Sequence, residues 1–321
     1  MAEPILDVEN LQTTFFTKAG ALRAVDGVSY QVGKGETVGI VGESGCGKSV
    51  TSFSILRLLS YPGEVTGGRI LFKGDNLLAL SPTEMRKVRG KKVAMIFQEP
   101  MTALNPVLTV GYQICEQILA HESVSKQEAR DRATELLGLV GIPSPERRVD
   151  DYPHQLSGGM RQRAMIAMAL SCNPEFLIAD EPTTALDVTI QAQILDLLQK
   201  LQEKYHMAMQ FITHDLGVIS ELADRVVVMY AGTVVEEASS AELFTSPKHP
   251  YTVGLLESIP QIGRIQKRLA TIPGVVPSLL TLPAGCRFQN RCPRATEPCR
   301  LAPPPLATNG AGRRLACYNP Y

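Results

Sequence analysis

The sequence predicts an α/β protein built around a parallel sheet, and three observations lead to this fold class. Short apolar runs with the length of buried strands alternate with longer segments in which apolar residues show helical spacing. A glycine-rich loop at residues 42–49 joins one such run to a helix. Strands that alternate with helices favour a parallel sheet covered by helices on both faces. The 321 residues supply enough material for one large domain or two smaller ones.

Strand and helix signals alternate along the chain. Apolar runs bounded by turn residues predict strands at residues 5–11, 27–41, 69–72, 92–97, 176–179, 209–212 and 225–229. The segment Thr13 to Leu22 is predicted to be an irregular connection between the first two strands. Helical periodicity predicts helices at residues 49–59, 110–120, 126–140 and 190–201. We expect an antiparallel β subdomain beside the parallel sheet.

The character of the sequence changes twice, and these changes divide the chain into three parts. Residues 1–98 and 171–246 carry the strand signals and form the predicted α/β core. Residues 99–170 show helical spacing after a proline-containing loop, which predicts a helical subdomain inserted into that core. Over residues 247–321 proline and glycine are frequent and periodicity is lost, which predicts a small loop-rich C-terminal extension.

The composition argues against two broad classes of protein. Lys+Arg and Asp+Glu both number 32, so the formal net charge is +0 and we expect no nucleic-acid partner. No apolar run approaches the roughly 18 residues that span a bilayer. The start Met1-Ala2-Glu3-Pro4 lacks the features of a signal peptide. We therefore expect a cytosolic protein, for which any membrane role would have to go through a partner.

The stretch Gly42-Glu43-Ser44-Gly45-Cys46-Gly47-Lys48-Ser49 fits the phosphate-binding pattern of glycine, four residues and then Gly-Lys-Ser. Its glycines let the backbone turn tightly and aim N–H groups at a polyphosphate beside a helix N-terminus. Lys48 would reach the β- and γ-phosphates, and the Ser49 hydroxyl would bind Mg²⁺. The predicted nucleotide-binding residues here are Gly42, Ser44, Gly45, Cys46, Gly47, Lys48, Ser49 and Val50.

Two carboxylates, Asp180 and Glu181, directly follow the apolar run Phe176 to Ala179. The carboxyl end of a parallel strand is where such sheets meet their ligands. Asp180 would hold Mg²⁺ through water, and Glu181 would orient and deprotonate the water that attacks the γ-phosphate. We therefore predict that this strand end carries the hydrolytic chemistry.

A second helix start lies in the segment Leu156-Ser157-Gly158-Gly159-Met160-Arg161-Gln162-Arg163. The N–H groups exposed at such a helix N-terminus suit a phosphate. One chain does not need two phosphate sites for one ATP. We therefore expect Ser157, Gly158 and Gly159 to cap the ATP held by another subunit, with two nucleotides sandwiched in a head-to-tail dimer.

In their order along the chain, the phosphate loop, the Ser157-Gly158-Gly159 segment and the Asp180-Glu181 strand end resemble the motifs of the nucleotide-binding subunits of ATP-binding-cassette (ABC) transporters. Gln98 after a strand, Ala185-Leu186-Asp187 and His214 agree with that family, and the resemblance covers residues 5–260. It implies a P-loop ATPase core that uses ATP and Mg²⁺. It also implies that Gln98 contacts Mg²⁺ and reports to the transmembrane partner, that Asp187 communicates across the dimer, and that His214 hydrogen-bonds the γ-phosphate.

The end of the chain carries a narrower resemblance. His249-Pro250-Tyr251-Thr252, the prolines and the terminal cysteines are similar to the extension of ATPases that drive oligopeptide and dipeptide importers. This implies an ATPase at the cytoplasmic face of the inner membrane that energises peptide import through two transmembrane permease subunits, and indirectly through an extracytoplasmic peptide-binding protein. The choice among dipeptide, oligopeptide, nickel and glutathione stays open, as does pairing with a second copy or a paralogous ATPase.

Four cysteines crowd the C-terminal segment with the spacing Cys286-x5-Cys292-x6-Cys299-x17-Cys317. Disulfides are disfavoured in a reducing cytosol, so the cluster favours a metal or redox site. Zinc sites usually contain ligand pairs two to four residues apart, which are absent here, whereas wider spacing suits a [4Fe–4S] cluster. Members of the peptide-importer branch that the chain resembles carry such a cluster. Zinc, and free or disulfide-linked thiols, stay open as alternatives.

Two positions depart from the family pattern. Met160 stands where many family members have Gln, and Phe16 is the candidate for stacking on adenine.

Two other functions are hypotheses. A soluble ABC ATPase acting on DNA or ribosomes usually has a coiled-coil insertion, a second cassette or a basic surface, which the sequence lacks. The other hypothesis is a metal-sensing or redox-regulatory protein in which the terminal cysteines carry the function.

Overall fold

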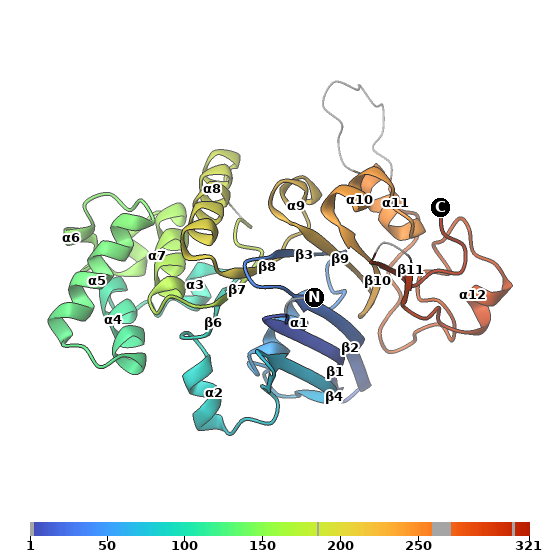
Figure 1. The fold of residues 1–321 in the computed structure, drawn as a ribbon, viewed down its shortest axis with the longest axis horizontal. Helices are drawn as coiled ribbons and strands as arrows, with labels where there is room; N and C mark the ends of the chain where they lie inside the picture. Colours follow the sequence, from blue (N-terminus) through green and yellow to red (C-terminus); the bar gives the residue numbers. More distant parts are fainter. Residues whose placement is uncertain (1–2, 185, 259–270, 310–311) are drawn as a thin grey trace. The chain divides into compact units, whose positions relative to one another are not determined.

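The chain folds into two compact units, and the computed structural model describes residues 3–184, 186–258, 271–309 and 312–321. The first unit combines Met1–Val32, Thr37–Leu78 and Phe211–Tyr321, and the second combines Gly33–Glu36 and Ala79–Gln210. Parallel and antiparallel strand pairs together with helices confirm the predicted α/β fold (Figure 1). The three-part division expected from the sequence stays a prediction. Ala185 and residues 259–270 of the predicted extension lie outside the described residues.

An antiparallel sheet in the first unit has the strand order β2-β1-β4-β5 (Figure 1). Its strands are β1 (Leu6–Thr17), β2 (Gly20–Val32), β4 (Gly63–Phe72) and β5 (Asp75–Asn76). The prediction of an irregular connection from Thr13 to Leu22 is wrong, because β1 and β2 pair along this segment as far as Thr17 and Gly20. Register shifts between Val8 and Leu11 and after Thr13 interrupt the alternation of buried and exposed residues, which obscured the strand pattern.

A second sheet in the first unit includes strands from the C-terminal extension. The parallel strands β3 (Thr37–Val41) and β9 (Arg225–Tyr230) are followed by β10 (Thr233–Ser239), β12 (Arg313–Leu315) and β11 (Ala307–Asn309), each antiparallel to its neighbour. β3 is buried along its whole length, as its apolar sequence predicts for a parallel strand. The unit also contains α1 (Lys48–Ile55), α9 (Leu216–Leu222), α10 (Ser240–Thr245), α11 (Pro250–Glu257) and α12 (Glu297–Leu301).

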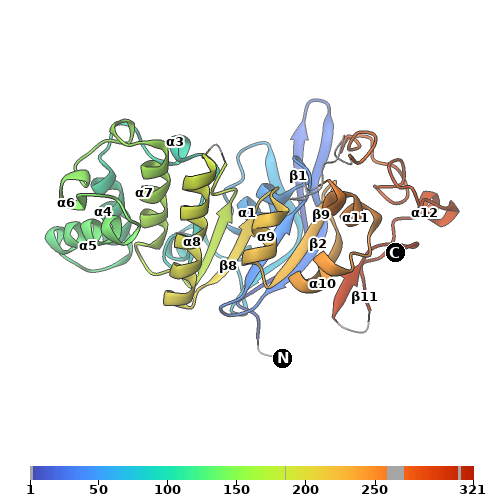
Figure 2. The ribbon, with the colours of Figure 1, turned by 90° about the horizontal axis from the view of Figure 1, so that it is seen from above.

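The second unit joins two parallel strands to a group of helices. β6 (Val93–Ile96) and β7 (Phe176–Asp180) are parallel and buried throughout, and β8 (Ala208–Ile212) continues from this unit into the first. Its helices are α2 (Pro82–Val88), α3 (Pro100–Ala103), α4 (Val110–His121), α5 (Lys126–Leu139), α6 (Pro145–Arg148), α7 (Gly158–Leu170) and α8 (Val188–Tyr205). Figures 1 and 2 show α7 and α8 side by side. In the described parts of the chain, no helix has the length and apolarity to cross a membrane.

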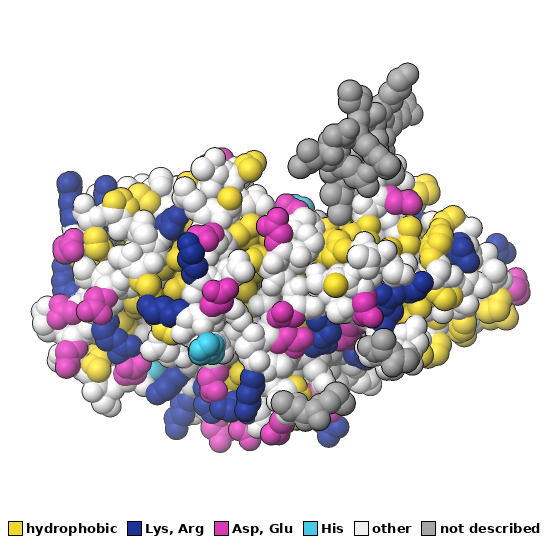
Figure 3. All heavy atoms as spheres, turned by 45° about the horizontal axis from the view of Figure 1, so that its top comes forward, with side chains coloured by type: hydrophobic (Ala, Val, Ile, Leu, Met, Phe, Trp, Pro, Cys, Tyr) yellow, Lys and Arg dark blue, Asp and Glu magenta, His cyan; other side chains and the backbone are white. Residues whose placement is uncertain are grey.

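Charged side chains of both signs are interspersed on the face shown in Figure 3. Lys and Arg side chains alternate there with Asp and Glu side chains rather than gathering in one basic patch. This pattern agrees with the formal net charge of +0.

An aromatic cluster anchors the extension to the first unit. The rings of Tyr230 on β9, Tyr251 on α11 and Phe288 pack with centroid separations of 4.6 to 5.4 Å, and the Phe288 ring lies 5.8 Å from the His249 ring. These four side chains are buried. Tilted and edge-to-face contacts at such separations each add about 0.5–1.5 kcal/mol beyond the burial of apolar area. The cluster therefore fixes the segment around Phe288 against β9.

His249 caps the first turn of α11 from inside this cluster. Its Nδ1 accepts a hydrogen bond from the Tyr251 N–H at 3.0 Å, and its own backbone N–H donates to the Glu236 carboxylate at 2.9 Å. Burial lowers the pKa of His249 to about 3. The imidazole is therefore neutral at physiological pH, as its role as a hydrogen-bond acceptor requires.

The buried His249 makes stability depend on pH. Because its pKa is about 3 when folded and about 6.5 when unfolded, the unfolded chain takes up the proton first as the pH falls. The stabilisation is present above pH ~6.5 and is lost below it. Between pH ~7.5 and ~5.5 the free energy of unfolding should fall by about 1.4 kcal/mol more in wild type than in His249→Asn, which keeps a capping acceptor. Urea unfolding measures this difference, and equal pH dependence of both proteins would contradict it.

Candidate functional site

The phosphate loop of residues 42–49 lies between β3 and α1 in the first unit, in the context the sequence predicts. The Lys48 side chain is buried and folds back over the loop. Its Nζ donates hydrogen bonds to the carbonyl oxygens of Gly42 at 2.7 Å and Glu43 at 3.2 Å. Ser44 and Gly45, by contrast, are exposed at the rim. The loop thus holds an ammonium group at its centre while leaving part of its backbone accessible.

The loop conformation depends on glycine at its end. Gly47 has φ 102°, in the left-handed region that L side chains rarely adopt, and a Cβ there would lie 2.6 Å from the Ala24 carbonyl oxygen. The carbonyl of the preceding Cys46 accepts a hydrogen bond from the Gly232 N–H at 3.0 Å. These contacts press the loop against β2 and the turn between β9 and β10. The loop is therefore rigidly formed by its surroundings.

Glu43 is held at both its backbone and its side chain. Its N–H donates to the Tyr251 hydroxyl at 2.8 Å, and its carboxylate accepts from both terminal nitrogens of Arg291, at 2.6 and 2.9 Å. Sequence reasoning missed both partners. Position 43 is one of the variable positions in the phosphate-loop pattern, and 248 residues separate it from Arg291. No local motif predicts a contact over that distance.

Two further predicted residues lie in the first unit. His214 is exposed and precedes α9, whose first turn is capped by the Asp215 carboxylate through the N–H groups of Gly217 and Val218. Phe16, the candidate for adenine stacking, lies near the end of β1 with 51% of its surface exposed. Both side chains are accessible to a ligand.

The acidic pair lies at the carboxyl end of β7 in the second unit. Asp180 is buried at the last position of the strand. Glu181 has φ 46°, a strained conformation for a residue with a side chain, of the kind that concentrates at functional sites. Its carboxylate accepts hydrogen bonds from Gln98 Nε2 at 3.0 Å and Thr184 Oγ1 at 2.9 Å. The fold thus brings together Gln98 and Glu181, which lie 83 positions apart in the sequence.

Ser157 and Asp187 start the neighbouring helices α7 and α8. The Ser157 hydroxyl accepts from the Met160 N–H at 3.3 Å, and the Asp187 carboxylate accepts from the Ile190 N–H at 3.0 Å. A Cβ added to Gly159 would lie 3.0 Å from the Ile190 side chain, whereas one added to Gly158 would face open space. Gly159 therefore permits close packing of the two helices, and Ser157 and Gly158 remain exposed.

The four terminal cysteines do not form the metal-ligand arrangement that their spacing predicts. Among the residues that the structure describes, which include all four, no group of three or more His, Cys, Asp or Glu side chains is placed to hold a metal ion. Burial raises the pKa of Cys317 to about 11, with further contributions from the neighbouring thiols of Cys292, Cys286 and Cys299. The thiols thus lie near enough to influence one another, but burial keeps the Cys317 thiol protonated.

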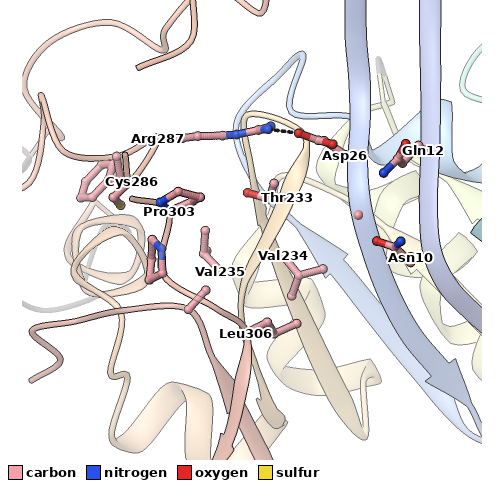
Figure 4. A pocket seen from close by; sticks show the side chains of 14 residues that line it. Asn10, Gln12, Asp26, Thr233, Val234, Val235, Cys286, Arg287, Pro303 and Leu306 are labelled. Atoms are coloured by element: carbon pink, nitrogen blue, oxygen red, sulfur yellow. Dashed lines mark hydrogen bonds and ion pairs between the residues drawn. The ribbon is translucent and has the colours of Figure 1, made fainter. Parts of the chain in front are cut away.

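Backbone N–H groups point at three of these sulfurs. Burial raises the pKa of Cys286, Cys292 and Cys317, and the N–H groups of Phe288 and Gln289, of Arg294 and of Asn319, respectively, offset part of that rise. Such donors favour thiolate. Cys286 also lines a cavity of about 290 Å³ between the extension and β1 and β10, shown in Figure 4 together with the Arg287–Asp26 ion pair. The Cys286 thiol therefore borders a cavity, while burial holds its pKa above the ordinary value.

Comparison with known proteins identifies the class. A family model described as ABC transporter matches residues 25–184, and one described as Oligopeptide/dipeptide transporter, C-terminal region, matches residues 235–299. A probable peptide ABC transporter ATP-binding protein of Sinorhizobium fredii is 56% identical over 99% of this chain and 95% of its own length. The dipeptide transport ATP-binding protein DppD of Escherichia coli is 52% identical over 98% of this chain and 97% of its own length.

A solved structure agrees with these relatives. The dimeric, post-hydrolysis ATP-binding cassette MJ0796, bound to ADP and Pi, has a TM-score of 0.66 and 30% identity over 73% of this chain and 98% of that one. Fold and motifs together define an ATPase of the ABC class. Within that class, the chain belongs to the family of ATP-binding subunits of peptide-importing ABC transporters. This confirms the resemblance found in its motifs.

The contacts of the loop glycines lead to a test of loop geometry. Gly45 has φ 77° and open space around its Cβ position, whereas Gly47 combines φ 102° with the close approach of the Ala24 carbonyl. Gly45→Ala should cost about 1–2 kcal/mol of stability from the left-handed backbone alone. Gly47→Ala should cost more, because the backbone clash adds to the same strain. Urea unfolding of both variants measures this, and equal losses would contradict the described loop packing.

Proposed function

We propose that this chain binds and hydrolyses ATP to drive the import of dipeptides or oligopeptides through separate membrane permease subunits. The observation that carries the proposal is the phosphate loop with the buried Lys48 ammonium at its centre. Relatives more than 50% identical over nearly the whole chain, named for peptide and dipeptide transport, support the substrate class. The choice among dipeptides, oligopeptides, nickel and glutathione is expected to lie in the permease and an external binding protein.

The nucleotide roles follow from the chemistry of each side chain. Lys48 would leave the carbonyls of Gly42 and Glu43 for the β- and γ-phosphates, while the backbone N–H groups of residues 42–50 surround the phosphates. Mg²⁺, when bound, would neutralise phosphate charge. Hard oxygen ligands suit this ion, and the chain offers the Ser49 hydroxyl, the Asp180 carboxylate and the Gln98 carbonyl.

The hydrolytic role is assigned to Glu181. Gln98 and Thr184 donate to its carboxylate, which orients the group, and the carboxylate is then able to accept a proton from the attacking water. His214, at the end of β8, would donate a hydrogen bond to the γ-phosphate. A positioned general base typically contributes about 10²–10⁴-fold to the rate.

The partner ATPase is proposed to face the start of α7. Ser157 and Gly158 are exposed at a helix N-terminus, where N–H groups and the helix dipole favour a phosphate. We expect this start to cap the nucleotide held by a second ABC ATPase, a copy or a paralogue, with Asp187 communicating between the two. The structure of MJ0796, which is dimeric with ADP and Pi, supports a pair of ATPase subunits. The Met160 N–H donates to the Ser157 hydroxyl at 3.3 Å, which fixes the Ser157 side chain at the start of α7.

The membrane partner is proposed to dock on the second unit, after Gln98. Three large apolar side chains around α3 and α4 are exposed there: Met101, Val107 and Tyr112. Exposed apolar side chains of this kind suit contact with a short apolar helix from a permease subunit. This would place the chain peripherally on the cytoplasmic face of the inner membrane, with two permease subunits as direct partners and a peptide-binding protein as an indirect one.

The terminal cysteines, which are not arranged as metal ligands in the described structure, are proposed to rearrange and bind a [4Fe–4S] cluster, with Zn²⁺ as the alternative. Four thiols suit either group as ligands. The N–H groups directed at Cys286, Cys292 and Cys317 would hydrogen-bond the ligating sulfurs. Binding needs the thiols to be deprotonated, and it would release their protons. The bound group would cross-link a loop-rich segment that has little apolar core of its own.

Replacement of the proposed base separates binding from hydrolysis. Glu181→Gln should bind ATP as the wild type does, hydrolyse it about 10²–10⁴-fold more slowly and accumulate as a closed ATP-bound dimer, because only proton transfer is lost. Phosphate release and size-exclusion chromatography with ATP measure the two effects. Thr184→Val, which removes a hydrogen bond to the same carboxylate, serves as a milder control. Wild-type turnover in Glu181→Gln would remove this residue from its role.

The identity of the bound group is testable by spectroscopy. Anaerobically purified protein should show a broad visible absorption band from iron–sulfur charge transfer and contain about four irons per chain. The variant Cys292→Ser should lose most of this absorption, whereas Cys172→Ser, a buried cysteine of the second unit, should keep it. A colourless protein that contains stoichiometric zinc would overturn the cluster in favour of the alternative.

A further inference from the structure

The C-terminal extension reaches the phosphate loop through Arg291. This guanidinium makes a two-pronged ion pair with the Glu43 carboxylate, and only 5% of the Arg291 side chain is exposed. Paired parallel N–H bonds to a carboxylate are among the stronger and more directional polar contacts in proteins. The contact therefore ties residue 43 of the loop to a fixed point in the extension.

Arg291 is itself held from behind. Its Nε donates to the Pro273 carbonyl at 3.0 Å, and its terminal nitrogens also donate to the Ile272 carbonyl and the Tyr230 hydroxyl, both at 3.3 Å. The guanidinium lies over the rings of Tyr230 and Phe288 at 5.8 and 5.9 Å. With this many partners the side chain is confined to one conformation, so Arg291 can transmit the position of the extension to Glu43.

Glu43 in turn sets the resting place of Lys48. Its carbonyl oxygen accepts from Lys48 Nζ and from the Cys46 N–H at 3.3 Å, while its own N–H is bound by Tyr251. A displacement of Glu43 would therefore move the ammonium group and the turn of the loop together. Arg291 acts on these groups only through Glu43.

A second arginine of the same segment supports the opposite side of the loop. Arg287 forms an ion pair with Asp26 and donates to the Ala231 carbonyl. The next residue, Gly232, donates its N–H to the Cys46 carbonyl, and the Asp26 N–H donates to the Gly232 carbonyl. The two arginines flank Phe288, which is fixed in the aromatic cluster.

Charge gives the Arg291 contact a consequence beyond packing. The Glu43 carboxylate is an anion in a loop whose chemistry suits an anionic ligand, so when unpaired it would repel the phosphates. The Arg291 guanidinium offsets that charge. About 28% of the Glu43 side chain is exposed, so salt in the solution can screen part of this repulsion.

We propose that Arg291 is a positioning residue for nucleotide binding, which holds Glu43 in place and neutralises its carboxylate, so that the C-terminal extension sets the ATP affinity of the phosphate loop. This inference rests on the proposed role of the loop in binding ATP. It assigns the extension a function at the nucleotide site that does not depend on the group bound by the cysteines.

Fluorescent-ATP titration of the full-length chain tests the proposal. Arg291→Gln should weaken nucleotide affinity about tenfold, equivalent to about 1.4 kcal/mol. The loss should be larger at low than at high ionic strength, because it arises from charge repulsion. The double variant Glu43→Gln/Arg291→Gln, which lacks both charges, should recover most of the affinity. In steady-state hydrolysis, the Arg291→Gln variant should raise KM for ATP while leaving kcat within about twofold of the wild type.

Control variants separate this effect from a general loss of structure. Arg294→Gln changes a nearby exposed arginine that lies over the Tyr321 ring and should bind ATP as the wild type does. Arg291→Lys keeps the charge and should lose no more than about threefold. It supplies the test if Arg291→Gln does not fold, as judged by urea unfolding, and a tenfold loss in that variant would overturn the charge argument.

The remaining outcomes are decisive as well. Wild-type affinity in Arg291→Gln, or a double variant as weak as the single one, would overturn the proposal, since the second result is what purely structural damage produces. Lys48→Ala should abolish binding. If Lys48→Ala binds ATP normally, the proposed function of the loop itself fails and the inference fails with it. If Lys48→Ala loses ATP binding but Arg291→Gln binds ATP as the wild type does, the inference fails while the proposed function of the loop stands.

Discussion

The hydrogen bonds between the Lys48 ammonium and the carbonyls of Gly42 and Glu43 are the interaction on which the account depends. They close a loop in which position 47 has a backbone conformation that favours glycine. They also hold the positively charged Lys48 ammonium where a polyphosphate would bind. A loop that must fold around its ligand would pay for ordering at each binding event. Here, neighbouring strands and the extension hold the loop in advance, so binding energy goes to the phosphates.

The second unit positions its polar groups at a strand end and at two helix starts. A buried strand ends in Asp180 and Glu181, and helix N-termini begin at Ser157 and Asp187. The strand end presents carboxylates and the helix starts present N–H groups at the boundary of an apolar layer. A ligand can reach these groups there without costly desolvation of the rest of the chain. Strain at Glu181 and its hydrogen bond from Gln98 show that this arrangement is held by tertiary contacts.

The sequence predicted what short-range patterns encode. The phosphate loop, the strand before it and the helix start at Ser157 each follow from spacing within about ten residues. The β1–β2 pairing escaped because register shifts interrupt its alternation. Contacts between distant positions, such as Glu43 with Arg291 and Gln98 with Glu181, depend on packing that no local pattern carries. The cysteine spacing predicted ligands, yet the pKa values of the thiols are set by burial and backbone N–H groups, which spacing does not reveal.

A structure of the chain with Mg²⁺ and a non-hydrolysable ATP analogue tests the central claim most directly. The account predicts that Lys48 Nζ leaves the Gly42 carbonyl and lies within hydrogen-bond distance of the β- and γ-phosphates. It also predicts that the backbone of residues 42–49 keeps the conformation described above and that Glu43 still contacts Arg291. Phosphates bound away from Lys48, or a loop rebuilt around the nucleotide with the Glu43–Arg291 pair broken, would contradict the account.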